Sequence, residues 1–238
     1  MTAVRVLSYN IRSLRDDPAA VTRVIRGLRP DVVCLQEVPR LPGWRRKRRR
    51  LARSCDLSVA AGRRAAGLAV LAGPRARVVH SEFHLLSRIP GLHRRGLAVA
   101  VLDLGTEGPL IAASTHLDLR DDPRRAHTAE VIGLLDRVRA AYPAPVVLAG
   151  DINEEPGGAS WSLLTGRFRD AHAAAPSGEA ATFSARNPRR RIDGVFTDPE
   201  IEVIACGVPA DPDLAADYPQ ATDHRPLLAQ LNPRRRPR

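Results

Sequence analysis

A chain of 238 residues can form one large domain or two small ones, and with 44% hydrophobic residues it can bury a sizeable core. No apolar stretch approaches the roughly 18 residues of a membrane span, and the strand-like segment at residues 4–8 leaves no room for a signal peptide. We therefore predict one domain over residues 1–232, a disordered basic tail over residues 233–238, and no membrane span.

The net charge of +11 raises the question of nucleic-acid binding, so its distribution along the chain matters. Two clusters supply ten of these charges, namely Arg45, Arg46, Lys47, Arg48, Arg49 and Arg50 in the first and Arg234, Arg235, Arg236 and Arg238 in the second. The rest of the chain is nearly neutral. Because runs of like charge usually form solvated surfaces, nucleic-acid contact by the first cluster is a hypothesis only.

The cysteines, Cys34, Cys55 and Cys206, show no metal-type spacing, and their odd number argues against a disulfide framework. A reducing compartment is therefore expected, and we predict a cytoplasmic protein.

Strand and helix patterns alternate at the start of the chain. Residues 4–9 alternate as a strand that ends on Asn10, and a helix begins at Asp17 with an apolar face toward the core. Residues 32–35 form a fully apolar strand that is followed by Glu37. This order indicates a layered α/β protein with a polar residue at the carboxyl end of each strand.

The basic run predicts a helix whose charges point outward. Trp44 beside it could stack on a base, although packing at an edge of the core is the commoner role of such a residue. Turns rich in glycine and proline then separate short strand-like segments, which favours antiparallel sheet. These segments are residues 57–60, 68–71, 78–86, 97–104 and 110–114.

Polar residues also follow the later strands. His116 follows the strand at 110–114, and the next helix has Asp122 as its predicted N-cap. After the strand at 145–150 come Asp151 and Asn153, which strand alternation directs to one side. Beyond them we predict an irregular stretch with a short helix near residues 161–164.

Asp193 interrupts an apolar strand at residues 192–196 and needs a partner, because strand interiors rarely bury an unpaired carboxylate. Asp223 and His224 lie just before the last predicted strand. The remaining predicted elements are a strand at 201–206, an acidic loop at 211–217 and the last strand at 227–231.

Together, eight polar residues lie at predicted strand ends: Asn10, Glu37, His116, Asp151, Asn153, Asp193, Asp223 and His224. They supply carboxylates, carboxamides and imidazoles that a sheet can gather at one rim. Oxygen ligands without a thiolate suit Mg²⁺ or Mn²⁺ better than structural zinc. Imidazoles beside such a metal suit phosphate chemistry.

Six short motifs resemble, in the same order, those of the endonuclease/exonuclease/phosphatase superfamily. They are Leu7–Asn10, Leu35–Val38, Ser114–Leu117, Gly150–Asn153, Arg191–Asp193 and Thr222–Pro226. The resemblance implies a four-layered α/β sandwich, in which two mixed, mainly antiparallel β-sheets pack face to face with helices outside. It also implies hydrolysis of a phosphoester by an activated water with the help of a metal ion.

The resemblance assigns the metal site to three residues. Glu37 is implied as the principal ligand of Mg²⁺, or of Mn²⁺, with Asn10 beside it and Asp223 completing or flanking the site.

The resemblance assigns the chemistry to the other five. Asp151 is implied to orient and deprotonate the attacking water, and Asn153 to hold the scissile phosphate. His224, held and polarised by Asp193, is implied to contact that phosphate, with His116 as the second histidine that does so.

Two positions depart from the family pattern. Many relatives carry an acid where this chain has Arg12, so that contribution to the metal site is missing, although Arg12 could meet a phosphate. Leu68 stands where an asparagine is usual, which puts the substrate contact of that asparagine in doubt. The motif around His116 is more typical of the deoxyribonuclease, sphingomyelinase and deadenylase branch than of the apurinic-site branch.

We expect the protein to be a monomer, and we consider three hypotheses for its function. The first is a metal-dependent phosphodiester hydrolase, specifically a nuclease. The second is a phosphatase or phosphodiesterase for a small-molecule or lipid head-group substrate, since the nearly neutral body shows no broad electropositive channel. The third is a non-catalytic binding module on the same fold, which would hydrolyse no model phosphodiester.

Overall fold

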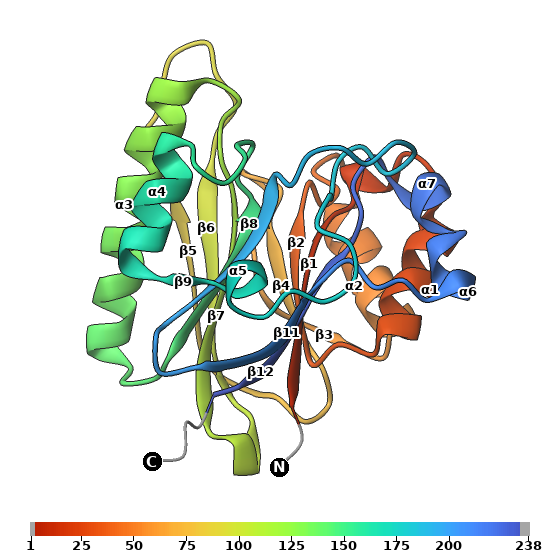
Figure 1. The fold of residues 1–238 in the computed structure, drawn as a ribbon, viewed down its shortest axis with the longest axis horizontal. Coiled ribbons are helices and arrows are strands. Elements are labelled where there is room, and N and C mark those ends of the chain that lie inside the picture. Colours follow the sequence, from red (N-terminus) through yellow and green to blue (C-terminus); the bar gives the residue numbers. More distant parts are fainter. Residues whose placement is uncertain (1–2, 234–238) are drawn as a thin grey trace.

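Two mixed sheets lie at the centre of the protein (Figure 1), and the computed structural model describes residues 3–233. In spatial order the first sheet contains β11 (Glu202–Gly207), β12 (Leu227–Asn232), β1 (Val4–Asn10), β2 (Val32–Gln36), β4 (Ala69–Ala72) and β3 (Ser58–Ala61). The second contains β5 (Arg77–Leu85), β6 (Gly96–Asp103), β7 (Pro109–His116), β8 (Val146–Asp151), β10 (Asp193–Thr197) and β9 (Arg169–Asp170). Only β1–β2 and β7–β8 are parallel pairs among these strands.

Helices cover the outer face of each sheet, so the protein has four layers (Figure 1). Over the first sheet lie α1 (Pro18–Leu28), α2 (Trp44–Ser54), α6 (Pro212–Ala215) and α7 (Tyr218–Ala221). Over the second lie α3 (Asp121–Ala141) and α4 (Ala159–Arg167), with α5 (Ala171–Ala174) next to β9. Short 3₁₀ turns are η1 (Arg12–Leu14) and η2 (Gly105–Glu107). The predicted four-layered sandwich is confirmed.

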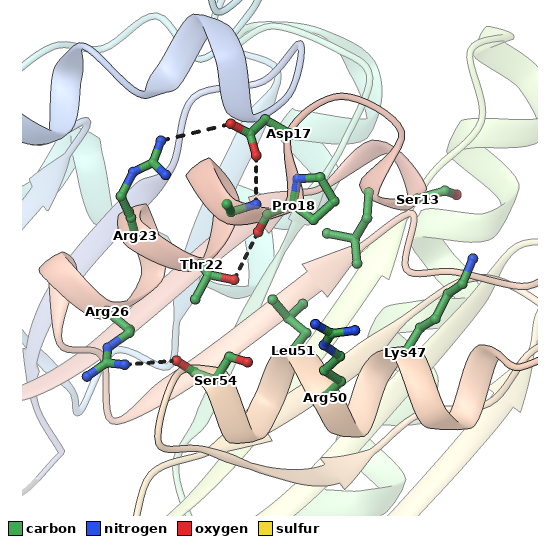
Figure 2. Close-up of a pocket in the computed structure, with 12 residues that line it drawn as sticks. Ser13, Asp17, Pro18, Thr22, Arg23, Arg26, Lys47, Arg50, Leu51 and Ser54 are labelled. Carbon is green, nitrogen blue, oxygen red and sulfur yellow. Dashed lines mark hydrogen bonds and ion pairs between the residues drawn. The ribbon is translucent and has the colours of Figure 1, made fainter.

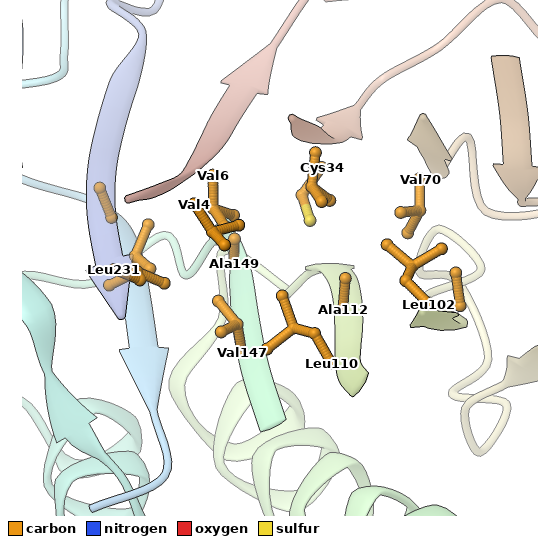
Figure 3. Packing of buried hydrophobic residues seen from close by; sticks show 14 of the residues in the cluster. Val4, Val6, Cys34, Val70, Leu102, Leu110, Ala112, Val147, Ala149 and Leu231 are labelled. Carbon is orange, nitrogen blue, oxygen red and sulfur yellow. The ribbon is translucent and has the colours of Figure 1, made fainter. Parts of the chain in front are cut away.

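Side chains of the central strands alternate between two faces, and both faces are buried, one between the sheets and one under the helices. Between the sheets, Val6 and Cys34 of the first pack in one cluster with Ala112 and Ala149 of the second (Figure 3). The opposite faces pack under the helices, for example Leu7 of β1 in a cluster with α1. Such strands have no solvated face, and their acidic and basic side chains occur at or next to the ends.

The basic helix differs from its prediction at one position. Arg48 of α2 points inward, is 3% exposed, and donates hydrogen bonds to the carbonyls of Leu68 (3.2 Å) and Arg63 (3.0 Å). Burial lowers the pKa of the Arg48 guanidinium to about 10. The other charged side chains of α2 are exposed, as predicted.

Three details of the predicted secondary structure are wrong. The cap of α3 is Arg120, and Asp122 lies inside the first turn, where proline at the next position is tolerated because first-turn amides lack helical partners. The acidic loop contains α6, which Asp211 caps by accepting from the amide of Asp213. The irregular stretch after α4 contains β9 and α5. Residues 234–238 of the predicted tail lie outside the described residues. The domain boundary at residue 232 stays a prediction.

Two further observations concern the sequence predictions. The three cysteines are buried and free, and burial raises the pKa of each thiol to about 12. Within residues 3–233 no helix is both long enough and apolar enough to cross a membrane.

A buried ion pair supports the strand that carries Asp193. Asp170 of β9 accepts from both terminal nitrogens of Arg191, at 3.0 and 2.8 Å, and from the indole of Trp161 at 3.1 Å. Burial raises the pKa of the Asp170 carboxyl, but the hydrogen bonds and charge of Arg191 outweigh burial and leave that pKa below its usual value. The pair therefore stabilises the fold at neutral pH, and this stabilisation is lost as the pH falls through the lowered pKa.

Asp170→Ala is expected to lower the free energy of unfolding by about 3–5 kcal/mol, because it leaves Arg191, whose side chain is only 11% exposed, without its partner. Urea denaturation at neutral pH measures this loss. The matched control is Asp136→Ala, which removes an exposed partner of Arg167 and should cost about 1 kcal/mol or less. Equal losses in both variants would contradict the structural role of the Asp170 pair.

Candidate active site

Strand register brings four of the predicted residues to one rim of the sandwich. Asn10, His116, Asp151 and Asp193 lie two or four residues from apolar side chains that pack between the sheets, so they occupy inward-facing positions. All four are buried. Each lies at the end of its strand where the apolar packing stops, which lets polar side chains meet one another.

Asp151 lies at the centre of this group. Its Oδ2 accepts from Asn10 Nδ2 at 3.0 Å and lies 3.4 Å from His116 Nε2 and 3.6 Å from His224 Nε2. Its Oδ1 accepts from the amide of Asn153 at 3.0 Å. The carboxylate is therefore fixed in orientation and faces both histidines.

The buried acid at position 193 has the partner it needs. His224 Nδ1 lies 2.9 Å from Asp193 Oδ2, and the amide of Asp193 donates to Thr182 Oγ1 at 3.2 Å. Burial alone would lower the pKa of His224, but the charges of Asp193 and Asp151 raise it to about 10. His224 is therefore an imidazolium at neutral pH, held between two carboxylates.

His116 has the opposite protonation state. Burial lowers its pKa to about 3, with Asp151 opposing and Arg95 and Arg40 adding to the decrease. The Asn153 side-chain amide donates to the carbonyl of Leu117 at 3.0 Å and lies 3.1 Å from His116 Nε2. His116 Nε2 also lies 3.4 Å from Asp151 Oδ2, so this ring nitrogen is the one that faces the site.

The residues predicted to bind metal lie beside this group. Asn10 Nδ2 lies 3.4 Å from Glu37 Oε1, in addition to its bond to Asp151. Thr222 Oγ1 lies 3.1 Å from the carbonyl of Asn10 and 3.2 Å from the Asp223 carboxylate, which ties Asp223 to the end of β1. Asp223 also pairs with Arg12, whose Nε lies 3.5 Å away.

The donor atoms of Asp151, Asp193 and His224 lie within 4.8 Å of one another, which is a metal-type arrangement in the described part of the chain. This set differs from the predicted ligands. The hydrogen bond between His224 and Asp193 accounts for the closeness of these two residues without an ion.

Backbone strain concentrates at this rim. Five of the seven non-glycine residues with positive φ in the range 3–233 lie here, namely Arg12, Ser13, Leu14, Glu37 and Asn153. Such conformations cost of order 1 kcal/mol or more each and persist where the surroundings impose them. These residues follow Asn10 and Asp151 or include Glu37, so the strained backbone coincides with the predicted site residues.

Sequence reasoning missed several contributors to the site. Arg95 is 9% exposed, and its Nε lies 3.4 Å from the buried carboxylate of Asp118. Asp118 follows His116 at the spacing that separates Asn153 from Asp151, a repeat that could have drawn attention to it. The side chain of Leu68, by contrast, is fully buried between the sheets and offers no polar contact.

Solved structures share this architecture. An endonuclease/exonuclease/phosphatase from Bacteroides vulgatus has a TM-score of 0.79 and 22% identity, covering 97% of this chain and 99% of its own. A mannosyl-6-phosphatase from Bacteroides thetaiotaomicron has a TM-score of 0.80 and 16% identity, covering 96% and 99%. D. rerio TDP2, complexed with single strand DNA product, has a TM-score of 0.74 and 17% identity, covering 98% and 100%. No curated protein gave a significant match in sequence.

The fold is thus that of a four-layered α/β sandwich with a buried Asp–His rim, a class that includes phosphoester hydrolases. The family model of the endonuclease/exonuclease/phosphatase family matches residues 7–224. The chain belongs to that family of hydrolytic phosphoesterases, and the predicted relationship is confirmed.

Proposed function

We propose that this chain is a divalent-metal-dependent phosphodiesterase that attacks its substrate with an activated water, and that the substrate is a nucleic acid. The observation that carries the proposal is the arrangement of a carboxylate, Asp151, next to a histidine, His224, that Asp193 keeps charged. One group can accept the proton of water while the other stabilises negative charge on the phosphate.

The residues predicted to hold the metal fit a hard divalent cation. Asn10, Glu37 and Asp223 offer oxygen donors only, as Mg²⁺ or Mn²⁺ prefers. Glu37 is half-buried and forms no ion pair with any described residue, so its charge is free to meet a cation. A bound ion would neutralise a non-bridging phosphate oxygen and stabilise the leaving oxygen.

The remaining residues position the substrate and move the proton. Asp151 takes the proton from the attacking water through Oδ2, the oxygen that faces both histidines. The His224 imidazolium donates toward the phosphate through Nε2, because its Nδ1 is bonded to Asp193. Asn153 holds the phosphate by exchanging its bond to His116 for one to a phosphate oxygen, and His116 is the second histidine beside that phosphate.

Mg²⁺ is expected to raise the melting temperature, because a ligand that binds only the folded state stabilises it, and EDTA is expected to reverse the increase. For a chain of this size each kcal/mol corresponds to about 2–4 °C. Differential scanning fluorimetry measures the shift. In Glu37→Ala the increase should be lost, whereas an unchanged increase would remove Glu37 from the metal site.

A hydrolysis panel tests the function as a whole. With Mg²⁺ or Mn²⁺, we expect cleavage of bis-p-nitrophenyl phosphate and of nucleic acid, with Asp151→Ala as the blank. The panel includes single- and double-stranded DNA, RNA, phospholipids and inositol phosphates. No hydrolysis of any phosphoester, together with no effect of Mg²⁺ on melting, would favour a non-catalytic binding module instead.

The second candidate is a phosphatase or phosphodiesterase for small-molecule or lipid head-group substrates. The nearly neutral charge outside the two basic clusters favours it, and the structural neighbours include a mannosyl-6-phosphatase as well as a protein bound to a DNA product. Preferential hydrolysis of inositol phosphates or phospholipids in the panel would establish this candidate.

A further inference from the structure

We propose that the groove between α1 and α2 binds a single-stranded nucleic acid beyond the scissile bond. This inference rests on the proposed function and names the form of its substrate. The groove has a volume of about 960 Å³, in the range of sites that enclose small ligands. Its lining comprises Ser13, Leu14, Asp17, Pro18, Ala19, Thr22, Arg23, Arg26, Lys47, Arg50, Leu51 and Ser54.

The groove begins next to the candidate metal residues. The turn η1 starts two residues after Asn10, and the amide of Ser13 donates to the carbonyl of Glu37 at 2.6 Å. Ser13 and Leu14 of the same turn line the groove, and Figure 2 shows Ser13 at its edge. The groove therefore adjoins the segment that carries Glu37, and a strand bound with a phosphate at Glu37 lies next to it.

The two walls of the groove differ in charge. On the α1 side, Arg23 pairs with Asp217 at 2.6 Å, and Arg26 lies 3.5 Å from Asp56. On the α2 side, Lys47 and Arg50 extend into the groove (Figure 2) and form no ion pair with any described residue. The α2 wall therefore offers two unpaired cations at the spacing of one helical turn.

The positive charge continues along α2 past the groove. Arg45, Arg46, Arg49 and Arg53 line an adjacent hollow of about 570 Å³ and form no ion pair among residues 3–233, and the helix contains no acid. Arg48 does not belong to this exposed row, because it is buried and its hydrogen bonds to backbone carbonyls hold the helix in place. The cations are thus held in a row, as binding to a strand of phosphates requires.

The floor of the groove distinguishes a nucleic acid from other polyanions. It is apolar, with half-buried Leu14, exposed Pro18 and Ala19, and buried Leu51. An apolar floor between cations suits a base with its phosphate, because every base has an apolar face. A base reaches such a recess only when it is unstacked, which favours a single strand over a duplex.

The test compares Lys47→Glu/Arg50→Glu with Arg125→Glu/Arg137→Glu. The control reverses two exposed arginines of α3 that form no ion pair with any described residue, so both variants change the net charge equally. The readout is the ratio of kcat/KM for a 12-nucleotide single strand to kcat/KM for bis-p-nitrophenyl phosphate. The groove variant should lower this ratio at least about tenfold, and its salt slope for binding should fall by about 1.4, as expected for two lost phosphate contacts.

A second variant fills the groove without changing charge. Ala19→Trp should lower the same ratio, and binding of a labelled 12-mer to Asp151→Ala should weaken in both groove variants. An unchanged ratio in Lys47→Glu/Arg50→Glu, or an equal decrease in the α3 control, would overturn the groove assignment. So would weakened binding to anionic phospholipid vesicles with unchanged oligonucleotide binding, which would assign the cations to a membrane surface. Absence of bis-p-nitrophenyl phosphate hydrolysis in the wild type would instead reject the proposed function.

Discussion

Asp151→Ala is expected to lower kcat by about 10² to 10⁴-fold, the contribution typical of a positioned acid–base group, while the protein stays folded. The reason is the central position of this carboxylate, which contacts Asn10 and faces His116 and His224 within 3.6 Å. No other carboxylate faces both histidines in the described structure. Steady-state hydrolysis of bis-p-nitrophenyl phosphate with Mg²⁺ measures the loss.

The control for this prediction is Asp213→Ala, which removes an exposed acid of α6 and should keep full activity. Circular dichroism and thermal melting of Asp151→Ala establish that it is folded. Wild-type turnover in a folded Asp151→Ala protein would remove Asp151 from the mechanism.

Asp193→Asn and His224→Ala are each expected to lower kcat by about 10² to 10⁴-fold, and the double variant by little more than either alone. The two residues act as one unit, because Asp193 holds the His224 ring at 2.9 Å and keeps it charged. Without that charge the ring cannot stabilise negative charge on the phosphate at neutral pH. The kcat values of the four proteins in this cycle provide the measurement.

A spectroscopic measurement separates this role from a purely structural one. In Asp193→Asn the pKa of His224, raised to about 10 in the native protein, should fall, because its largest favourable charge is gone. Histidine NMR titration in EDTA follows it. Losses in kcat that multiply in the double variant, or a His224 pKa that does not move, would show that the two residues act independently.

Much of the fold follows from local pattern. Alternation in β1 and continuous apolar residues in β2 and β8 predict buried strands, and the Asp17 cap places the start of α1 correctly. The weaker predictions depended on short polar segments. The acidic residues around α6 suit a loop as well as a capped turn of helix, and local sequence does not separate the two.

The inner side of α2 illustrates what local pattern leaves out. Arg48 is the same residue type as most cations around it, but it lies three and four residues before Leu51 and Ala52 and so shares their buried face. Its inward position depends on two carbonyl groups, of Arg63 and Leu68, which belong to another part of the chain. Helical spacing thus indicates the face of Arg48, whereas the packing of α2 against that segment supplies the carbonyls that satisfy the buried guanidinium.

The sequence by itself determined the family. It also indicated which strands carry polar residues at their ends, and hence the eight residues predicted for the site. It did so because strand periodicity is local and each motif lies within a few residues. The tertiary structure decided the rest. It brought Asp151 from β8 within reach of Asn10 from β1 and paired Asp193 with His224, and it set the opposite protonation states of the two histidines. It also formed the groove between α1 and α2. These properties depend on burial and on distances between segments far apart in the chain, which no local pattern contains.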